Sequence, residues 1–286
     1  MERTFSLSPK ESFLTDYRLP PLSFSVERPL STTLKSAWLT FQNKPIDPRI
    51  RSLRMLLSED PMLPDEEQAG LTMALAAATW QAGNGAKARR LAEKSLEQFP
   101  KRWASHRILI DILMAQHFYE EALNYLEAVK SPRRLPGWDS PFPKRERLTC
   151  AAACAWHLKQ WDAVASNLRR GYPKGPAQMP RPLQEDWFRL ALYRQSPEDA
   201  AEAAHELVNV GALEFTDAVL QTLVQQGWGE QALPLYRTMF SEDPRNQLLR
   251  RRLVALCIKQ GKITEARAFA EPGALDLSAG HYKLSG

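Results

Sequence analysis

The segments GWGEQAL (residues 227–233) and GKITEAR (residues 261–267) decide the fold that this chain is expected to adopt. They belong to a set of small residues that repeat at an interval of 34 positions: Gly227 and Gly261, Ala232 and Ala266, and Ala88 and Ala122. A fixed period of about this length is typical of helical hairpins that stack on one another. The pattern therefore predicts an open solenoid rather than a closed enzyme pocket.

Apolar residues around these positions recur at three- and four-residue spacing, which indicates amphipathic helices. Four units, each with two helices, have the clearest pattern: 69–102, 103–136, 213–246 and 247–280. Two weaker hairpins are expected over 144–171, with a register uncertain by one residue, and over 183–210. Residues 30–61 are expected to form an irregular first hairpin with Pro45 and Pro48 in its turn. The chain should therefore contain six or seven antiparallel hairpins.

The unit over 213–246 shows the internal pattern most completely. Gly227 lies at the turn between its helices, Ala232 lies early in the second helix, and Pro244 ends the unit. A glycine permits the left-handed backbone that closes a helix, an alanine lets two helices approach closely, and a proline cannot continue a helix. Tyr236 adds a large residue four positions after the alanine.

This pattern resembles the tetratricopeptide repeat, a helix–turn–helix unit of about 34 residues. The other clear units fit at these positions: Gly83, Ala88 and Pro100; Ala122 and Leu126, with His117 in place of the turn glycine; and Gly261 and Ala266. The resemblance spans roughly residues 30–280. It implies an all-α, right-handed solenoid of hairpins, preceded by an extended N-terminal arm.

The chain is expected to divide into four regions. Residues 1–29 form the extended, proline-containing arm, and residues 30–136 carry the N-terminal repeats. Residues 137–212 carry degenerate hairpins with proline-rich loops, and residues 213–286 carry the C-terminal repeats and a tail. The arm is rich in large apolar residues for a free tail: Phe5, Leu7, Phe13, Leu14, Tyr17, Leu22 and Phe24. We expect it to pack along the solenoid, and the alternative is a tail that orders only on a partner.

Two proline-rich loops, 131–143 and 171–182, interrupt the array. Compact helical proteins rarely carry such long loops without a reason. Two interpretations stay open. The loops are insertions at one edge of the solenoid, or the first loop uses Trp138 and Phe142 to fold back onto the surface or to contact a partner.

Composition excludes several classes of protein. The chain has 38 Lys and Arg against 33 Asp and Glu, a net charge of +5, which permits an acidic partner but is weaker than the clustered charge of a committed nucleic-acid binder. Three scattered cysteines favour reduced thiols over a disulfide framework. No apolar run has the length of a signal peptide or a membrane span. We therefore expect a soluble cytoplasmic protein with no membrane span.

Few residues indicate chemistry. Cys150, Cys154 and His157 share one face of an expected helix and could in principle ligate a metal, but zinc sites usually need four ligands, and buried cysteines often pack as small hydrophobes. No phosphate-loop, dinucleotide-binding, zinc-protease or nucleophile-elbow motif occurs. We expect no catalytic residue, no cofactor and no enzymatic activity, and a metal-binding protein that uses these three residues is kept as an alternative.

A run of three arginines, Arg250-Arg251-Arg252, lies near the start of a first helix, where positive charge is disfavoured by the helix dipole. By the register of the resemblance, Arg251 points into the groove, with Lys259 two turns later. Residues 200–246 carry a charge of −5 and residues 247–267 a charge of +5. The arginines therefore either face the acidic neighbouring repeat or bind an acidic peptide or a phosphate group.

The resemblance implies that first helices line a concave binding groove. On that face the repeat over 69–102 carries Met73, Ala77 and Trp80, and the repeat over 103–136 carries Arg107, Asp111 and Met114. We interpret this groove as largely apolar, as suits a hydrophobic or helical segment. The asparagines of the family's clamp for a C-terminal carboxylate are missing, so that activity is not transferred to this chain.

The leading hypothesis is a scaffold that binds a partner peptide or helix in the groove, as an assembly factor, an adaptor or a chaperone-like holder. The candidate partner-binding residues are Trp80, Arg107, Met114, Arg251 and Lys259. The second hypothesis is RNA binding by a helical repeat. Because the repeats carry no regular pair of base-reading polar residues, we expect a protein partner rather than nucleic acid. The sequence has no signal for the oligomeric state.

Overall fold

The chain forms two compact units, which we call the N-unit (Leu14–Pro173) and the C-unit (Lys174–Gly286 together with Met1–Phe13). The computed structural model describes residues 12–19, 25–26, 39, 45–59, 63–100, 103–128, 138–139, 142–209 and 213–270. The boundary between the units lies inside the region 137–212, which the sequence groups together. The four-region division therefore stays a prediction.

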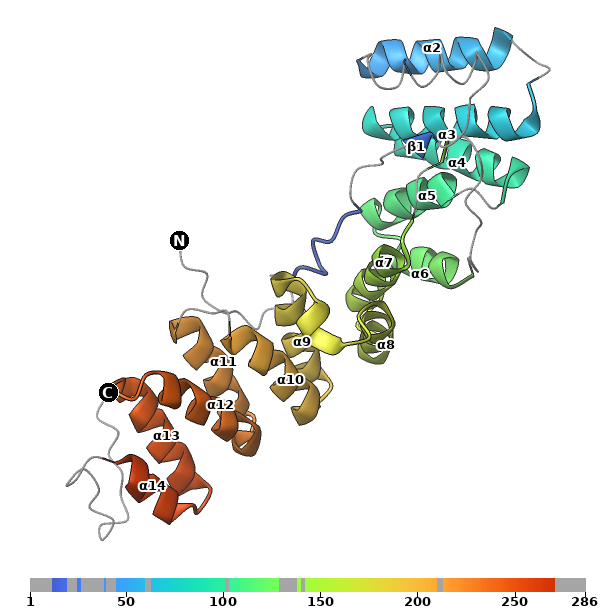
Figure 1. Cartoon of the computed structure of the whole chain (residues 1–286). Helices are drawn as coiled ribbons and strands as arrows, with labels where there is room; N and C mark the ends of the chain where they lie inside the picture. Colours follow the sequence, from blue (N-terminus) through green and yellow to red (C-terminus); the bar gives the residue numbers. More distant parts are fainter. Residues whose placement is uncertain are drawn as a thin grey trace. The chain divides into compact units, whose positions relative to one another are not determined.

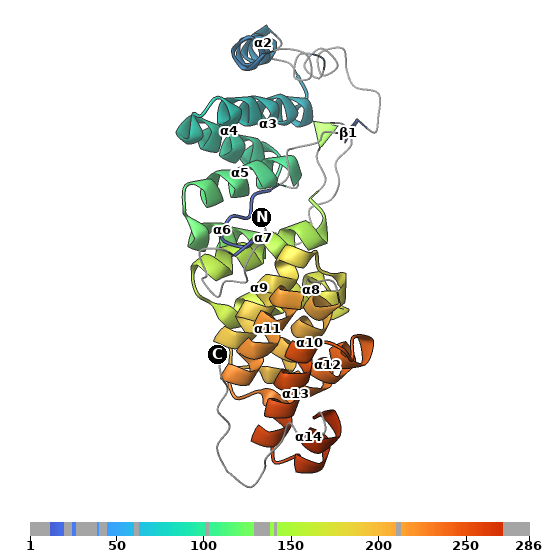
Figure 2. The same cartoon turned by 90° about the vertical axis from the view of Figure 1, so that its left-hand side faces the viewer.

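Helices dominate the described part of the N-unit (Figure 1). Its elements are β1 (Ser25–Val26), α2 (Ile46–Glu59), α3 (Asp65–Gln81), α4 (Gly85–Gln98), α5 (Trp103–Ala115), α6 (Tyr119–Ala128), β2 (Trp138–Asp139), α7 (Lys144–His157) and α8 (Trp161–Gly171). Helices α3 to α8 form three hairpins, and each hairpin packs on the next in chain order (Figures 1 and 2). The two short strands pair antiparallel, with Ser25 opposite Asp139 and Val26 opposite Trp138.

The C-unit contains a short 3-10 helix followed by three more hairpins. Its elements are η2 (Gly175–Gln178), α9 (Arg181–Tyr193), α10 (Pro197–Val208), α11 (Leu213–Gln225), α12 (Gly229–Glu242), α13 (Gln247–Lys259) and α14 (Ile263–Phe269). Each of these hairpins also packs on the next one in the chain. The predicted all-α solenoid of antiparallel hairpins is confirmed. Among the described residues, no helix combines the length and the hydrophobicity needed to cross a membrane.

The same turn joins the two helices of every described hairpin. Its central residue has a positive φ in all six: Gly83, His117, Lys159, Gln195, Gly227 and Gly261. In each turn, the amide of the next residue donates to a carbonyl five positions earlier, as in Asn84 to Thr79 at 3.1 Å and Trp228 to Leu223 at 2.9 Å. This is the Schellman geometry, which satisfies the last carbonyls of a helix. The predicted substitution of His117 for a turn glycine is therefore correct, with φ at 65°.

Five positions after the residue with positive φ in each turn, the second helix carries a small residue that is fully buried. The set is Ala88, Ala122, Val164, Ala200, Ala232 and Ala266, each 0% exposed. Because the position is measured from the turn, it also sets the register of the hairpin over 144–171: Val164 holds the place of the alanine. The two weak hairpins therefore keep the geometry of the clear ones, although their sequences have drifted.

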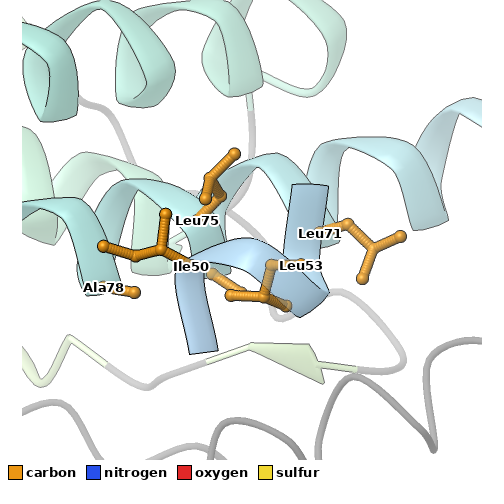
Figure 3. Packing of buried hydrophobic residues seen from close by; sticks show 6 residues of the cluster. Ile50, Leu53, Leu71, Leu75 and Ala78 are labelled. Atoms are coloured by element: carbon orange, nitrogen blue, oxygen red, sulfur yellow. The ribbon is translucent and has the colours of Figure 1, made fainter. Parts of the chain in front are cut away.

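Helix α2 packs against helix α3 of the first described hairpin through apolar side chains. Ile50 and Leu53 on α2 pack against Leu71, Leu75 and Ala78 on α3 (Figure 3).

The prediction that Pro48 lies in a turn is wrong. Pro48 lies in the first turn of α2, where a missing amide proton removes no helical hydrogen bond. Apart from Leu39, residues 30–44 of the expected first hairpin lie outside the described residues.

The second proline-rich loop is shorter than the sequence indicates. Helix α8 continues to Gly171, and the second loop then contains η2, in which Pro176 is buried. In the first loop Phe142 is 4% exposed, so this residue folds back onto the protein, as one of the two interpretations requires. Most of the rest of that loop lies outside the described residues.

Candidate partner-binding surfaces

In the N-unit, the first helices of three successive hairpins are linked by polar contacts. The indole Nε1–H of Trp80 on α3 donates to Asp111 Oδ2 on α5 at 2.7 Å. Arg107, one turn earlier on α5, forms an ion pair with Glu146 on α7 at 2.9 Å. We call the surface formed by Trp80, Arg107, Asp111, Glu146, Cys150 and His157 the inner face. All six residues lie on α3, α5 or α7.

Burial and charge oppose each other on the inner face. Burial raises the pKa of Asp111, whereas the hydrogen bond from Trp80 and the positive charges of Arg107 and Arg18 lower it. Burial also raises the pKa of Glu146, and Arg107 again opposes the shift. A desolvated carboxyl group is costly unless it is paired, so these two acids need the cations beside them.

Sulfur contacts join α5 to α7 on the same side of the unit. The thiol of Cys150 donates to Met114 Sδ at 3.0 Å, and both side chains are buried. Burial raises the pKa of Cys150 well above its usual value, so the group is a thiol rather than a thiolate. Arg107 is 4% exposed and Met114 is 2% exposed. Of the three candidates in this unit, only Trp80 is partly accessible.

Residues 14–19, from the expected N-terminal arm, run beside helices α5 to α7 (Figure 2), and Tyr17 and Arg18 lie close to residues of the inner face. His157 Nε2–H donates to the carbonyl oxygen of Thr15 at 3.1 Å. The tyrosine ring of Tyr17 is largely buried within electrostatic range of Cys150 and Glu146 on α7, and its pKa is raised mainly by burial. The expectation that the arm packs on the repeats is met by these residues, which lie beside α5, α6 and α7.

The imidazole that holds Thr15 is itself positioned by a neighbouring ring. His157 stacks on Tyr119, with ring centroids 3.8 Å apart and an interplanar angle of 4°. Burial lowers the pKa of His157, although its hydrogen bond to Thr15 opposes that shift. The ring is therefore held in its neutral form at neutral pH. A carbonyl can only accept, so Nε2 carries the proton.

The three arginines at the start of α13 have different surroundings. Arg252 pairs with Asp217 on α11 at 3.3 Å. Arg250 donates to the carbonyl of Pro244 at 3.0 Å and lies 5.7 Å above the ring of Phe240. Arg251 is exposed, and no carboxylate among the described residues pairs with it. The expectation that the run faces the acidic neighbouring repeat therefore holds for Arg252.

Asp217 accepts hydrogen bonds from Tyr236 on α12 and from Arg252 on α13. These two contacts fix the side of α11 that meets α13. The hydroxyl of Tyr236 donates to Asp217 Oδ1 at 3.0 Å, and Gln221 Nε2 donates to the same hydroxyl at 2.6 Å. Lys259, two turns after Arg251 on α13, is exposed and likewise has no carboxylate partner in the described part of the chain.

The residues of the metal-binding hypothesis have other partners. Cys150 contacts Met114, and His157 contacts Thr15 and Tyr119. Within the described residues, no group of three or more His, Cys, Asp or Glu side chains could hold a metal ion. Cys150, Cys154 and Cys257 are free and buried.

Residues 223–277 match the family profile of the tetratricopeptide repeat. The last two hairpins of the chain therefore carry the sequence pattern of the tetratricopeptide repeat. The matched residues include the turns at Gly227 and Gly261 and the buried Ala232 and Ala266, which are the positions that carry the 34-residue interval in the sequence.

One solved structure shows the same fold, and two others are similar at lower TM-scores. A tetratricopeptide repeat protein from Parabacteroides merdae has a TM-score of 0.51 and 12% sequence identity, covering 84% of this chain and 93% of that one. A thermophilic tetratricopeptide repeat protein from Thermus thermophilus has a TM-score of 0.28 and 15% identity, covering 79% and 97%. An assembly chaperone of RpL4 has a TM-score of 0.38 and 11% identity, covering 84% and 99%. No curated protein matches the chain significantly.

Sequence reasoning placed Trp80, Arg107 and Met114 together, and the structure brings Trp80 and Arg107 to one network through Asp111. It did not identify Glu146 or residues 14–19. Glu146 lies in a weak repeat, and residues 14–19 lie outside the repeats. The only signal for the latter was the high apolar content of the arm.

Proposed function

We propose that this tetratricopeptide repeat protein is a non-enzymatic scaffold that binds segments of partner proteins on the first helices of its repeats. In the C-unit, the observation that carries the proposal is the exposed pair Arg251 and Lys259 on α13. Neighbouring cations, Arg252 and Arg237, are neutralised by Asp217 and Glu265. Arg251 and Lys259 are thus available to an acidic partner segment.

In the N-unit, the proposed binding uses the inner face, with Trp80, Arg107 and the adjoining Met114 as its floor. The aromatic Trp80 and the apolar Met114 suit a partner segment with large apolar anchors. A scaffold of this kind would act as an assembly factor, an adaptor or a chaperone-like holder of its partner.

Charge reversal on α13 tests the proposal. We expect a fluorescein-labelled oligoglutamate peptide to bind the full chain in low salt and to dissociate as salt is added, because exposed charges are screened. The double variant Arg251→Glu/Lys259→Glu should bind about tenfold more weakly, since each exposed ion pair contributes up to about 1 kcal/mol. Fluorescence anisotropy measures both affinities.

A matched control separates the α13 surface from net charge. The double variant Lys262→Glu/Arg267→Glu makes the same charge change at the second helix of the same hairpin. If it weakens binding as much as the α13 variant, only net charge matters and the proposal fails. Tighter binding of a single-stranded oligouridine, lost in the α13 variant, would indicate RNA recognition instead.

A further inference from the structure

A short segment without regular secondary structure is anchored in the N-unit by two buried side chains. Leu14 is 0% exposed and Tyr17 is 9% exposed, whereas Asp16 and Arg18 between and after them are exposed. The segment belongs to no described helix or strand. Its burial therefore comes from packing against the helices of the unit rather than from pairing within an element.

The anchors of this segment are those of a bound peptide. A carbonyl of the segment, that of Thr15, accepts a hydrogen bond from His157. The charge of Arg18 lies close enough to Asp111 to lower the pKa of that carboxyl group. Buried apolar anchors, a backbone hydrogen bond and a complementary charge are elements by which proteins recognise peptide segments, and here residues 13–16 form a turn.

We propose that residues 14–18 are an intramolecular ligand of the inner face. A partner segment with the same pattern, a leucine, an aromatic residue three positions later and then a basic residue, binds the inner face in trans when residues 14–18 leave it. This inference rests on the proposed function, because it assumes that first-helix faces bind partner segments. It adds the chemistry of the partner and the device that controls access.

Weak attachment makes such a segment displaceable. Burying two large side chains gives a gain of the same order as the conformational entropy lost when five residues are ordered. The segment is favoured chiefly because it belongs to the same chain, and the effective concentration of a tethered segment is of the order of 1 mM. A partner in solution displaces the segment when the ratio of the partner's concentration to its Kd exceeds the ratio of the effective concentration to the segment's own Kd.

The probe for this inference is a fluorescein-labelled peptide with the sequence SFLTDYRL, residues 12–19 of the chain. We expect it to bind the full-length double variant Leu14→Asp/Tyr17→Asp at least about tenfold more tightly than the wild type, because the variant cannot occupy its own inner face. Asp16→Ala, at an exposed position of the same segment, should behave as the wild type. A peptide with the same two aspartate changes should not bind either protein.

A second variant avoids the buried positions. Arg18→Glu places a negative charge near Asp111 without removing either apolar anchor, and we expect it to bind the wild-type peptide about threefold more tightly than the unchanged chain. Circular dichroism of each variant checks that the helices are retained, and size-exclusion chromatography detects two chains that exchange their segments.

The outcomes separate this inference from the proposed function. Equal peptide affinity of the wild type and both variants would overturn the intramolecular ligand while leaving the inner face as a binding surface. Absence of peptide binding by folded variants would show that residues 14–18 are a permanent part of the core and would overturn the inference. A dimer formed through exchanged segments would also overturn it, since the occupant would then belong to a second copy.

Discussion

At the scale of single residues, the hairpins depend on one left-handed residue per turn. Glycine occupies this place in three turns, and His117, Lys159 and Gln195 occupy it in the others. A residue with a Cβ pays for the left-handed conformation, by roughly 1–2 kcal/mol for an L-amino acid in that region. The middle repeats, whose sequence pattern is weaker, have the strained turns at Lys159 and Gln195.

Lys159→Gly should stabilise the chain, and Gly227→Ala should destabilise it. Glycine removes the strain at Lys159 but adds freedom to the unfolded chain, so we expect a net gain of about 0.5 kcal/mol. No atom lies within 4 Å of a Cβ built on Gly227, so the loss of about 1 kcal/mol there comes from backbone conformation alone. Urea denaturation measures both. Shifts of the two midpoints in the same direction would contradict this account.

At the scale of elements, each second helix presents a fully buried small residue five positions after the turn. Close approach of the helices leaves no room for a larger side chain at this position, because protein interiors are packed as densely as organic crystals. This explains why alanine holds the place in five of the six described hairpins and valine in one.

Ala88→Leu should therefore destabilise the chain by about 1–3 kcal/mol, the usual cost of overpacking a core. Ala86→Leu makes the same change two residues earlier on α4, at an exposed position, and should alter stability by no more than about 0.5 kcal/mol. Urea denaturation compares the two variants. Similar effects at both positions would show that the packing of α4 is looser than described.

A buried histidine connects successive elements. His106 on α5 contacts Tyr125 on α6 through Nδ1 and donates from Nε2 to the carbonyl of Pro100 before α5, both at 2.6 Å. Burial lowers the pKa of His106 below its ordinary value of 6.5, and the bond to Pro100 opposes the shift. The folded chain therefore binds this proton less readily than the unfolded chain.

Stability should consequently fall as pH drops. The contribution of His106 is fully present above about pH 6.5 and is lost as pH decreases through its lowered pKa. Between pH 7 and pH 5 we expect the wild type to lose of the order of 1 kcal/mol more than His106→Gln, which does not titrate. Urea denaturation at the two pH values measures the difference. Parallel losses in both proteins would exclude His106 as the cause.

At the scale of the whole molecule, two units built from the same hairpin carry different surfaces. The N-unit joins its first helices through Trp80, Asp111, Arg107 and Glu146 and holds a segment of its own chain against them. The C-unit uses ion pairs between neighbouring helices and leaves Arg251 exposed. One fold therefore supplies two kinds of first-helix surface, because the first-helix side chains vary while the turn conformation and the small buried position do not.

Most of the fold was predictable because its determinants are local. A turn residue, a small residue five positions later and an apolar period act within about 34 residues, so the 34-residue spacing of Gly227 and Gly261 is enough to indicate stacked hairpins. His117 shows the limit of this reasoning, since its role was visible only by comparison with glycines in other repeats. The shift of Pro48 from a turn into α2 shows that helix boundaries are less determined than the helices themselves.

The sequence by itself determined the repeat, its turns and its buried small positions, because these depend on backbone conformation and on contacts within a unit and its neighbour. Tertiary structure alone decided that Leu14 is buried, that Tyr17 lies beside α5 and α7, and that Arg252 is paired whereas Arg251 is exposed. A segment outside the repeat has no period to place it. Its position follows from which buried surface accepts its side chains, and it brings together Thr15 and His157, which are 142 positions apart in the chain.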